Sequence, residues 1–336
     1  MRIGAIETKG IRGLPDVQIS LLDSAIGAPR SVTLVTGRNG SGKTALLRAI
    51  AWAWESVAAS PPPSASLVVR DGESRGVLGA AWHLSSEEAQ SAGRQCASIV
   101  ESRWEVGRRA SAEVGGEARL LFIGRPEKLG VGALEWVPAG AQLPLSKDLP
   151  LSDSSLATML LTKGTKDAPD KYEPLLAALH DLAVRQSTAA VSLLDERGVA
   201  FRSQVPDTLE TVKRNVATVC PDLRLESVEP RAGRRPLVWL HRRNGARAEM
   251  SDLSHGEKQG LFFAVLFAVV GFQRSIVLVD TPELYIHPAE HRAFFDAFCR
   301  LGTDNQLIVA TTSPAILGSV PSEHIVDLST LQNKGA

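Results

Sequence analysis

Apolar residues along the chain follow two spacings that together predict an α/β fold. Apolar residues three and four positions apart, the spacing of a buried helix face, occur at 172–184 and 209–219. Short apolar runs of strand length occur at 31–35, 276–279 and 307–310. Strands that alternate with helices in this way are typical of a parallel sheet covered by helices.

Changes in composition along the chain predict four regions. The segment 60–64 contains three consecutive prolines, which cannot continue a helix, and the residues after it are rich in Gly, Ser and Pro. We expect the first part of the α/β core at 1–60, an inserted β-rich lobe at 61–150, a helical lobe at 151–235, and the rest of the core at 236–336.

The composition is that of a globular chain in a reducing compartment. Apolar residues make up 44%, charged residues 22%, and the net charge is zero, so no general basic field marks a dedicated nucleic-acid binder. The cysteines are scattered without a CxxC pair, which argues against a zinc site or a disulfide framework. The longest apolar run, 261–270, falls short of the roughly 20 residues that span a bilayer. We therefore expect a cytoplasmic protein with no membrane segment.

Residues 37–44, Gly-Arg-Asn-Gly-Ser-Gly-Lys-Thr, match the P-loop (Walker A) pattern without a mismatch. Its glycines let backbone N–H groups converge on phosphate oxygens, and the following helix adds its positive end. Lys43 is expected on the β- and γ-phosphates, with Thr44 as a ligand of Mg²⁺. The ATP-binding residues predicted from this motif are Asn39, Gly40, Ser41, Gly42, Lys43 and Thr44.

Two further motifs lie in the C-terminal third of the chain. The apolar run 276–280 ends in Asp280, the Walker B pattern, and this carboxylate is expected to hold Mg²⁺ through a water. The segment 253–259, Leu-Ser-His-Gly-Glu-Lys-Gln, places Ser254 and Gly256 just ahead of a helix, where they can bind a phosphate. It also fits a capping box between Ser254 and Glu257, and the two interpretations are compatible.

These motifs resemble those of a known group of ATPases. The segment 253–259 resembles the signature motif of ABC-type ATPases, and the opening residues through the P-loop are similar to those of RecF, SMC and OLD-type ATPases. Residues 280–288, Asp-Thr-Pro-Glu-Leu-Tyr-Ile-His-Pro, resemble a block of the same group. The resemblance covers 1–55 and about 210–320, and it implies an ABC/SMC-like head, a P-loop NTPase with an inserted β-rich lobe and a helical lobe.

The resemblance also implies how such a head works. Two heads associate head to tail, and each ATP lies between the P-loop of one head and the signature motif of the other. Carried over, residues 37–44 and Asp280 act on ATP in cis, while Ser254 and Gly256 contact its γ-phosphate in trans. The D-loop of the family falls at 284–287, and no Q-loop glutamine can be placed.

The chain departs from this group at two positions. Most members have a glutamate after the Walker B aspartate and a histidine in the switch position, whereas this chain has Thr281 and Thr312. Threonine cannot act as a general base near neutral pH. We expect either slow hydrolysis or a substitute role for Glu283 as the water-positioning carboxylate. Lys43, Asp280 and Glu283 are therefore the predicted catalytic residues.

Two patterns have plainer interpretations. Residues 287–291 fit HxxEH, a zinc-protease pattern, but their place after Walker B favours a loop leading into a helix. Arginines at 234–235, 242–243 and 247 fit a solvated strand face, with a nucleic-acid or partner surface as the alternative.

The function that follows is an ATPase head that dimerises on ATP with Mg²⁺ and regulates a separate effector protein, with bacterial defence as one setting. A RecF-like repair ATPase that binds DNA is the alternative. The nucleotide-binding subunit of a membrane transporter is a third class, disfavoured by the RecF-like opening.

Overall fold

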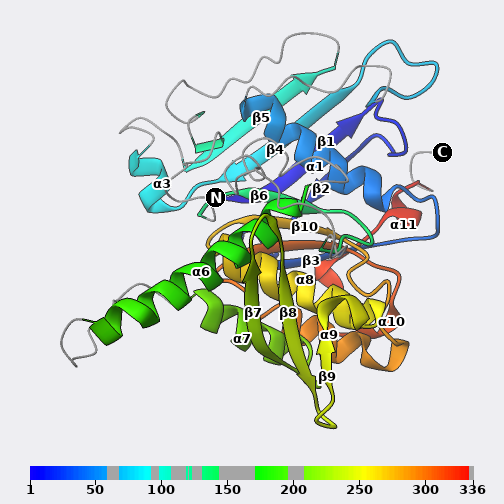
Figure 1. The fold of residues 1–336 in the computed structure, drawn as a ribbon. Helices are drawn as coiled ribbons and strands as arrows, with labels where there is room; N and C mark the ends of the chain where they lie inside the picture. The colour runs from blue at the N-terminus through cyan, green and yellow to red at the C-terminus, as the bar shows by residue number, and fades with distance from the viewer. Residues whose placement is uncertain are drawn as a thin grey trace.

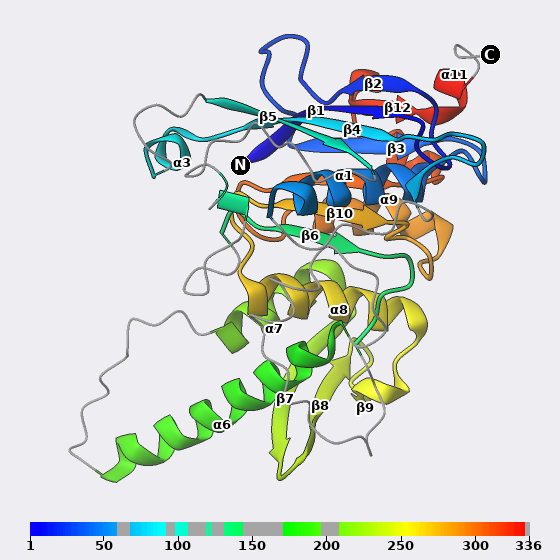
Figure 2. The same cartoon turned by 90° about the horizontal axis from the view of Figure 1, so that it is seen from above.

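The structure, a computed structural model, describes residues 1–58, 68–91, 98–106, 119, 121–122, 131–143, 171–195 and 208–332. Its elements are stacked in layers (Figures 1 and 2). An antiparallel sheet lies on one side, helix α1 (Lys43–Ala58) lies beneath it, and a parallel sheet forms the centre. Helices and a smaller antiparallel sheet cover the opposite face.

The central sheet confirms the predicted α/β fold. All its neighbouring strands run parallel. Within the described residues its order is β12 (Ile325–Asp327), β3 (Val32–Thr36), β11 (Gln306–Ala310), β10 (Ile276–Asp280) and β6 (Leu134–Val137). Between β11 and β12 the chain forms helix α10 (Pro314–Leu317) and the 3₁₀ turn η4 (Ser322–His324). Helix α11 (Leu328–Gln332) follows β12.

Strand β10 shows why this sheet is buried on both faces. Ile276 and Leu278 pack into the core on the α1 side, whereas Val277 and Val279 pack into the core on the α8 side. All four are fully buried. Parallel strands covered on both faces read as continuous apolar runs, which is why the sequence pattern detects them.

The layer on the α1 side is an antiparallel sheet. Its order is β2 (Val17–Ser20), β1 (Arg2–Lys9), β4 (Val77–His83) and β5 (Ile99–Glu105), with α1 at Lys43–Ala58 and α3 at Ser86–Ser91. Strands β4 and β5 belong to the range predicted as an inserted β-rich lobe, whereas β6, from the same range, lies in the central sheet. The division of the chain into four regions stays a prediction.

The layer on the other face holds the C-terminal helices. Helix α8 is apolar on all sides and fully enclosed over most of its length, as expected of a core helix. The elements here are α6 (Glu173–Asp195), α7 (Thr208–Val219), β7 (Leu223–Arg231), β8 (Arg234–Arg242), β9 (Arg247–Glu249), η2 (Met250–Asp252), α8 (His255–Val270), η3 (Pro288–Glu290) and α9 (His291–Phe298). Within the described part of the chain, no helix is both long and apolar enough to cross a membrane.

Candidate nucleotide-binding site

The candidate site lies at the carboxyl edge of the central sheet. Strand β11 separates β3 from β10, and its last residue, Ala310, pairs with Val35 on one side and Asp280 on the other. The P-loop therefore begins beside the end of the Walker B strand. Ligands of open α/β sheets bind at this edge, where the strand ends and the loops that follow them converge.

The P-loop has a backbone that only small residues permit. Gly42 has a φ of 95°, and a Cβ atom on it would come within 2.1 Å of the carbonyl oxygen of Gly13. The N-terminal hairpin thus supports the loop from outside. Helix α1 begins at Lys43, so the loop continues into a helix N-terminus as a phosphate-binding loop requires.

Lys43 lies folded over the loop that precedes it. Its Nζ donates to the carbonyl oxygens of Gly37, at 2.9 Å, and Arg38, at 3.0 Å. The ammonium group is therefore held at the mouth of the loop, next to the exposed residues Asn39 and Gly40, while Ser41 is buried within it. A phosphate placed in this loop would meet a positive charge already in position.

The structure brings the two predicted metal-binding residues into direct contact. Thr44 Oγ1 donates to Asp280 Oδ2 at 2.6 Å across a separation of 236 residues. Asp280 is only 6% exposed. A threonine hydroxyl and a carboxylate are hard oxygen donors of the kind that Mg²⁺ prefers, so the pair fits the metal that a nucleotide would bring.

Glu283 lies just beyond the Walker B strand. It is 5% exposed, and its Oε1 accepts a hydrogen bond from the Thr311 hydroxyl. Glu283, Thr281 and Thr312 line an open cavity of about 580 Å³. The structure thus gathers the two replaced positions and the candidate substitute carboxylate around one space.

The signature segment forms the N-terminus of α8 and has a complete capping box. Glu257 N donates to Ser254 Oγ at 3.2 Å, and Ser254 N donates to Glu257 Oε2 at 2.7 Å. Arg242 also donates to both carboxylate oxygens of Glu257. Burial alone would raise the pKa of Glu257, but the hydrogen bonds from Arg242 and Ser254 outweigh it and lower that pKa. The carboxylate therefore stays charged at the helix N-terminus, where the helix dipole favours it.

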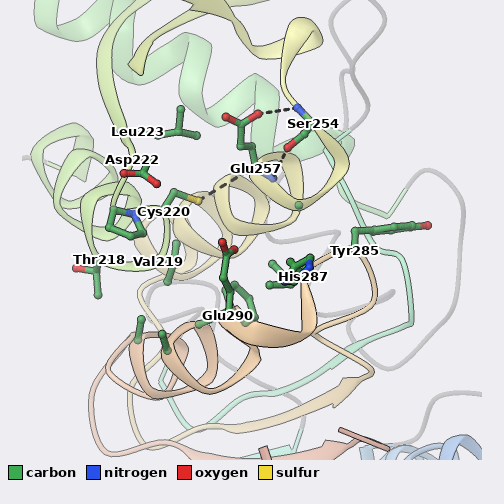
Figure 3. A pocket seen from close by; sticks show the side chains of 16 residues that line it. Thr218, Val219, Cys220, Asp222, Leu223, Ser254, Glu257, Tyr285, His287 and Glu290 are labelled. Carbon is green, nitrogen blue, oxygen red and sulfur yellow. Dashed lines mark hydrogen bonds between the residues drawn. The ribbon is translucent and has the colours of Figure 1, made fainter. Parts of the chain in front are cut away.

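Gly256 packs against the segment predicted as the D-loop. A Cβ atom on it would lie 2.8 Å from the carbonyl oxygen of Tyr285. Gly256 and Tyr285 also line a cavity of about 490 Å³, which lies between the end of α7, the start of α8 and residues 285–297 (Figure 3). Burial, reinforced by the Glu257 carboxylate, raises the pKa of the Cys220 thiol in its wall to about 12. The thiol is therefore protonated near neutral pH.

Ser254 and Gly256 thus have a different set of neighbours from Thr44 and Asp280. The first pair adjoins Glu257 and Tyr285, whereas the second pair lies at the carboxyl ends of the central strands. Leu284 and Tyr285 beside the signature segment are 47% and 42% exposed, unusual values for large apolar side chains.

One further candidate for the site could not be found from the sequence. Strand β6 runs parallel to β10, with Val137 opposite Val279, so the loop after it emerges at the edge that carries Asp280. Gln142 in this loop has a buried Nε2 without a hydrogen-bond partner among the described residues. Its only sequence signal is a four-residue strand after a long stretch without a pattern.

Three of the arginines of the β7–β8–β9 sheet, Arg242, Arg243 and Arg247, are paired with acids. Arg242 bonds Glu257, Arg247 donates to Glu226 at 2.7 Å, and Arg243 lies 3.7 Å from Asp222. Arg247 also stacks over Trp239, 4.0 Å from its ring. These contacts agree with the interpretation as a solvated strand face.

The HxxEH segment is a loop leading into a helix, as expected from its position. The side chain of His287 caps the 3₁₀ turn η3, and α9 begins at His291. Both ring nitrogens of His291 have hydrogen-bond partners, Ser313 Oγ and the Ile286 carbonyl oxygen.

Comparison with known proteins supports the assignment of these motifs. A family model described as "AAA domain, putative AbiEii toxin, Type IV TA system" matches residues 132–318, and one described as "AAA domain" matches residues 5–74. No curated protein matches the sequence.

Among solved structures, the fold is similar to an SMC head bound to the C-terminal winged-helix domain of ScpA. The TM-score is 0.54 at 17% identity, over 95% of this chain and 93% of that one. An SMC head with an extended coiled coil, bound to the C-terminal domain of ScpA from Pyrococcus furiosus, gives a TM-score of 0.50 at 15% identity. That match covers 95% of this chain and 92% of the other.

Proposed function

Since the chain belongs to the family described as "AAA domain, putative AbiEii toxin, Type IV TA system" and has the fold of an SMC/ABC-like P-loop ATPase, we propose that it is an ATP-operated switch. In this proposal it binds ATP with Mg²⁺, closes head to tail on a second copy, and hydrolyses ATP slowly. The closed form then regulates a separate effector protein.

The contact between Thr44 and Asp280 carries the proposal for ATP and Mg²⁺. A P-loop threonine and a Walker B carboxylate meet at 2.6 Å, with Lys43 held at the mouth of the loop. A magnesium ion brought with the nucleotide would be held by the Thr44 hydroxyl oxygen, which keeps its proton, and by Asp280 through a water. The P-loop residues 39–44 would hold the phosphates with their backbone N–H groups.

The form of the signature segment supports closure on a second copy. Ser254 is exposed at the N-terminus of α8, and the neighbouring Leu284 and Tyr285 expose apolar surface. An exposed helix N-terminus favours an anion, here the γ-phosphate of an ATP held by the second head. Apolar side chains around it would be buried when the two heads close.

The replaced positions support slow turnover. Thr281 and Thr312 line the cavity at the Walker B end, and neither can take a proton from water near neutral pH. Glu283 borders the same cavity and is the carboxylate we assign to orient the attacking water. A dimer that ATP holds closed and that hydrolyses slowly is suited to regulating the activity of a partner, rather than to driving repeated conformational cycles.

The family description suggests the setting. It names a putative toxin of a type IV toxin–antitoxin system, which supports bacterial defence as the setting in this proposal. We assign the chain the regulatory role and its partner the effector role. DNA as the ligand is the alternative, and the paired arginines of the β7–β9 sheet do not favour it.

The test combines oligomeric state with ATP turnover. We expect the wild type to dimerise only with ATP and Mg²⁺, Lys43→Ala to lose ATP binding, and Ser254→Arg to bind ATP but stay monomeric. Ser20→Arg, at an exposed position on β2, is the matched control and should dimerise normally. A monomeric wild type with bound ATP would exclude the switch, and salt-sensitive, DNA-stimulated turnover would favour the DNA alternative.

A second measurement tests the water-positioning role. Glu283→Gln keeps the size of the side chain and its acceptor for Thr311 but removes the carboxylate. We expect ATP binding to persist and turnover to fall by about 100-fold, the lower range for loss of a general base. Unchanged turnover in Glu283→Gln would remove Glu283 from the mechanism.

A further inference from the structure

A continuous chain of hydrogen bonds joins His291, at the start of α9, to Glu283. His291 Nδ1 lies 2.8 Å from Ser313 Oγ. The backbone N–H of Ser313 donates to Thr311 Oγ1 at 3.0 Å, and the Thr311 hydroxyl donates to Glu283 Oε1. These hydrogen bonds therefore involve Thr311 and Ser313, the two neighbours of Thr312, which stands where related ATPases have a histidine.

The partners fix the direction of each hydrogen bond. His291 Nε2 lies 2.9 Å from the carbonyl oxygen of Ile286, which can only accept, so Nε2 carries the proton. In the neutral ring Nδ1 is then an acceptor, and the Ser313 hydroxyl donates to it. Thr311 accepts from the Ser313 amide and uses its own proton for Glu283.

This arrangement leaves one carboxylate oxygen of Glu283 free. Oε1 is held by Thr311, whereas Oε2 is buried and has no hydrogen-bond partner among the described residues. A buried acceptor without a partner costs free energy, so its retention calls for an explanation. Glu283 and His291 line the same cavity of about 580 Å³, so the carboxylate lies in the wall of a space large enough to hold water.

We propose that His291 is a positioning residue for ATP hydrolysis, which acts through Ser313 and Thr311 to hold Glu283 with Oε2 directed to the attacking water. This rests on the proposed function, and in particular on the role of Glu283. His291 thereby supplies from α9 the support that Thr312 cannot give from the switch position. Because both its ring nitrogens are engaged, it acts through its neighbours rather than on the phosphate.

The two hydrogen bonds of His291 can be separated by substitution. Asparagine places an acceptor near the position of Nδ1, so His291→Asn preserves the link to Ser313 and loses the bond to Ile286. Glutamine places a donor near Nε2, so His291→Gln preserves the bond to Ile286 and loses the link to Ser313. His291→Ala loses both.

The experiment measures kcat, KM and ATP affinity of these variants with Mg²⁺. We expect kcat to fall by on the order of 10-fold to 100-fold in His291→Ala and His291→Gln, to recover in His291→Asn, and ATP affinity to stay unchanged. His241→Asn, at an exposed position on strand β8, is the control. Recovery in His291→Gln instead would show that His291 merely anchors α9, and would overturn the proposal.

Combination with Glu283→Gln tests the route. If His291 acts through Glu283, then Glu283→Gln with His291→Ala turns over no more slowly than Glu283→Gln alone. A further loss in the double variant would overturn the proposal. A wild type that binds ATP without any turnover removes both Glu283 and His291 from the mechanism, whereas turnover that no His291 variant changes removes His291 alone.

Discussion

The hydroxyl of Thr281 donates to Asp280 Oδ1 at 3.0 Å from a left-handed backbone with a φ of 50°. The backbone N–H of Thr281 also donates to the Ala310 carbonyl oxygen at 2.8 Å. This residue therefore ties the end of β10 to the end of β11 while it holds the second oxygen of the Walker B carboxylate. A β-branched residue adopts this conformation only at a cost.

The strain at Thr281 predicts opposite effects of two substitutions. Asparagine tolerates the left-handed region and can still donate to Asp280, so Thr281→Asn should raise the free energy of unfolding by about 1 kcal/mol. Thr281→Val keeps the β-branch and loses the hydrogen bond to Asp280, so this substitution should lower the free energy of unfolding by about 1 kcal/mol. Urea unfolding measures both, and equal losses in the two variants would show that the backbone is unstrained.

The contact between Thr44 and Asp280 predicts a metal-dependent effect. Asp280→Asn keeps the shape of the side chain but removes the charge that faces the metal. We expect ATP affinity to fall by about 10-fold to 100-fold when Mg²⁺ is present, and to change little in EDTA. Calorimetry with and without Mg²⁺ tests this, and Glu101→Gln, at an exposed position on strand β5, is the control. An equal loss in EDTA would place Asp280 outside the metal site.

The lowered pKa of Glu257 predicts how stability depends on pH. A carboxyl whose pKa is lower in the folded state contributes stability above its unfolded value, about 4.3, and loses it as pH falls through the folded value. Glu257→Gln should therefore be less stable than the wild type at pH 7, and the difference should shrink as the pH falls below about 4.3 and vanish only below the lowered pKa of Glu257. Unfolding curves from pH 3 to 7 measure this, and a constant difference would contradict the prediction.

A buried ion pair beside the central sheet predicts a large loss of stability. Lys171 Nζ lies 2.7 Å from Glu135 Oε1, and both side chains are 0% exposed. Burial raises the pKa of Glu135, and the pair with Lys171 opposes that rise. Lys171→Met would leave a buried carboxyl without its cation and should cost about 3–5 kcal/mol.

The matching double variant separates charge from packing. Glu135→Gln with Lys171→Met removes both charges and leaves Tyr172 an acceptor for its hydroxyl. Most of the lost stability should return, because no unpaired charge remains. A double variant as unstable as Lys171→Met would show that the lysine stem contributes mainly by packing.

The parts of the fold that could be predicted are those whose signal is local. Strands β10 and β11 read as apolar runs because both of their faces are buried, and the P-loop is recognisable because its glycines follow a strand directly. The capping box at Ser254 and Glu257 was also predicted, since it depends on residues three positions apart.

The remaining features depend on contacts between distant segments. Strand β6 has only four residues, and it belongs in the central sheet because it pairs with β10 more than 130 residues later, as Leu134 opposite Ile276 shows. The hydrogen bond of Thr311 to Glu283 and the contact of Gly256 with Tyr285 likewise require the strand order. No spacing along the chain signals such contacts.

The order of strands in the central sheet has a consequence for synthesis. Strand β3, which leads into the P-loop, is made within the first tenth or so of the chain, but its neighbours β11 and β12 lie at 306–310 and 325–327. Until those segments leave the ribosome, neither edge of β3 has a strand to pair with. The apolar side chains of β3 then stay exposed on the nascent chain. Contacts of such long sequence separation slow folding. Nucleotide binding should therefore be acquired in one late step, so that an interrupted chain cannot compete for ATP.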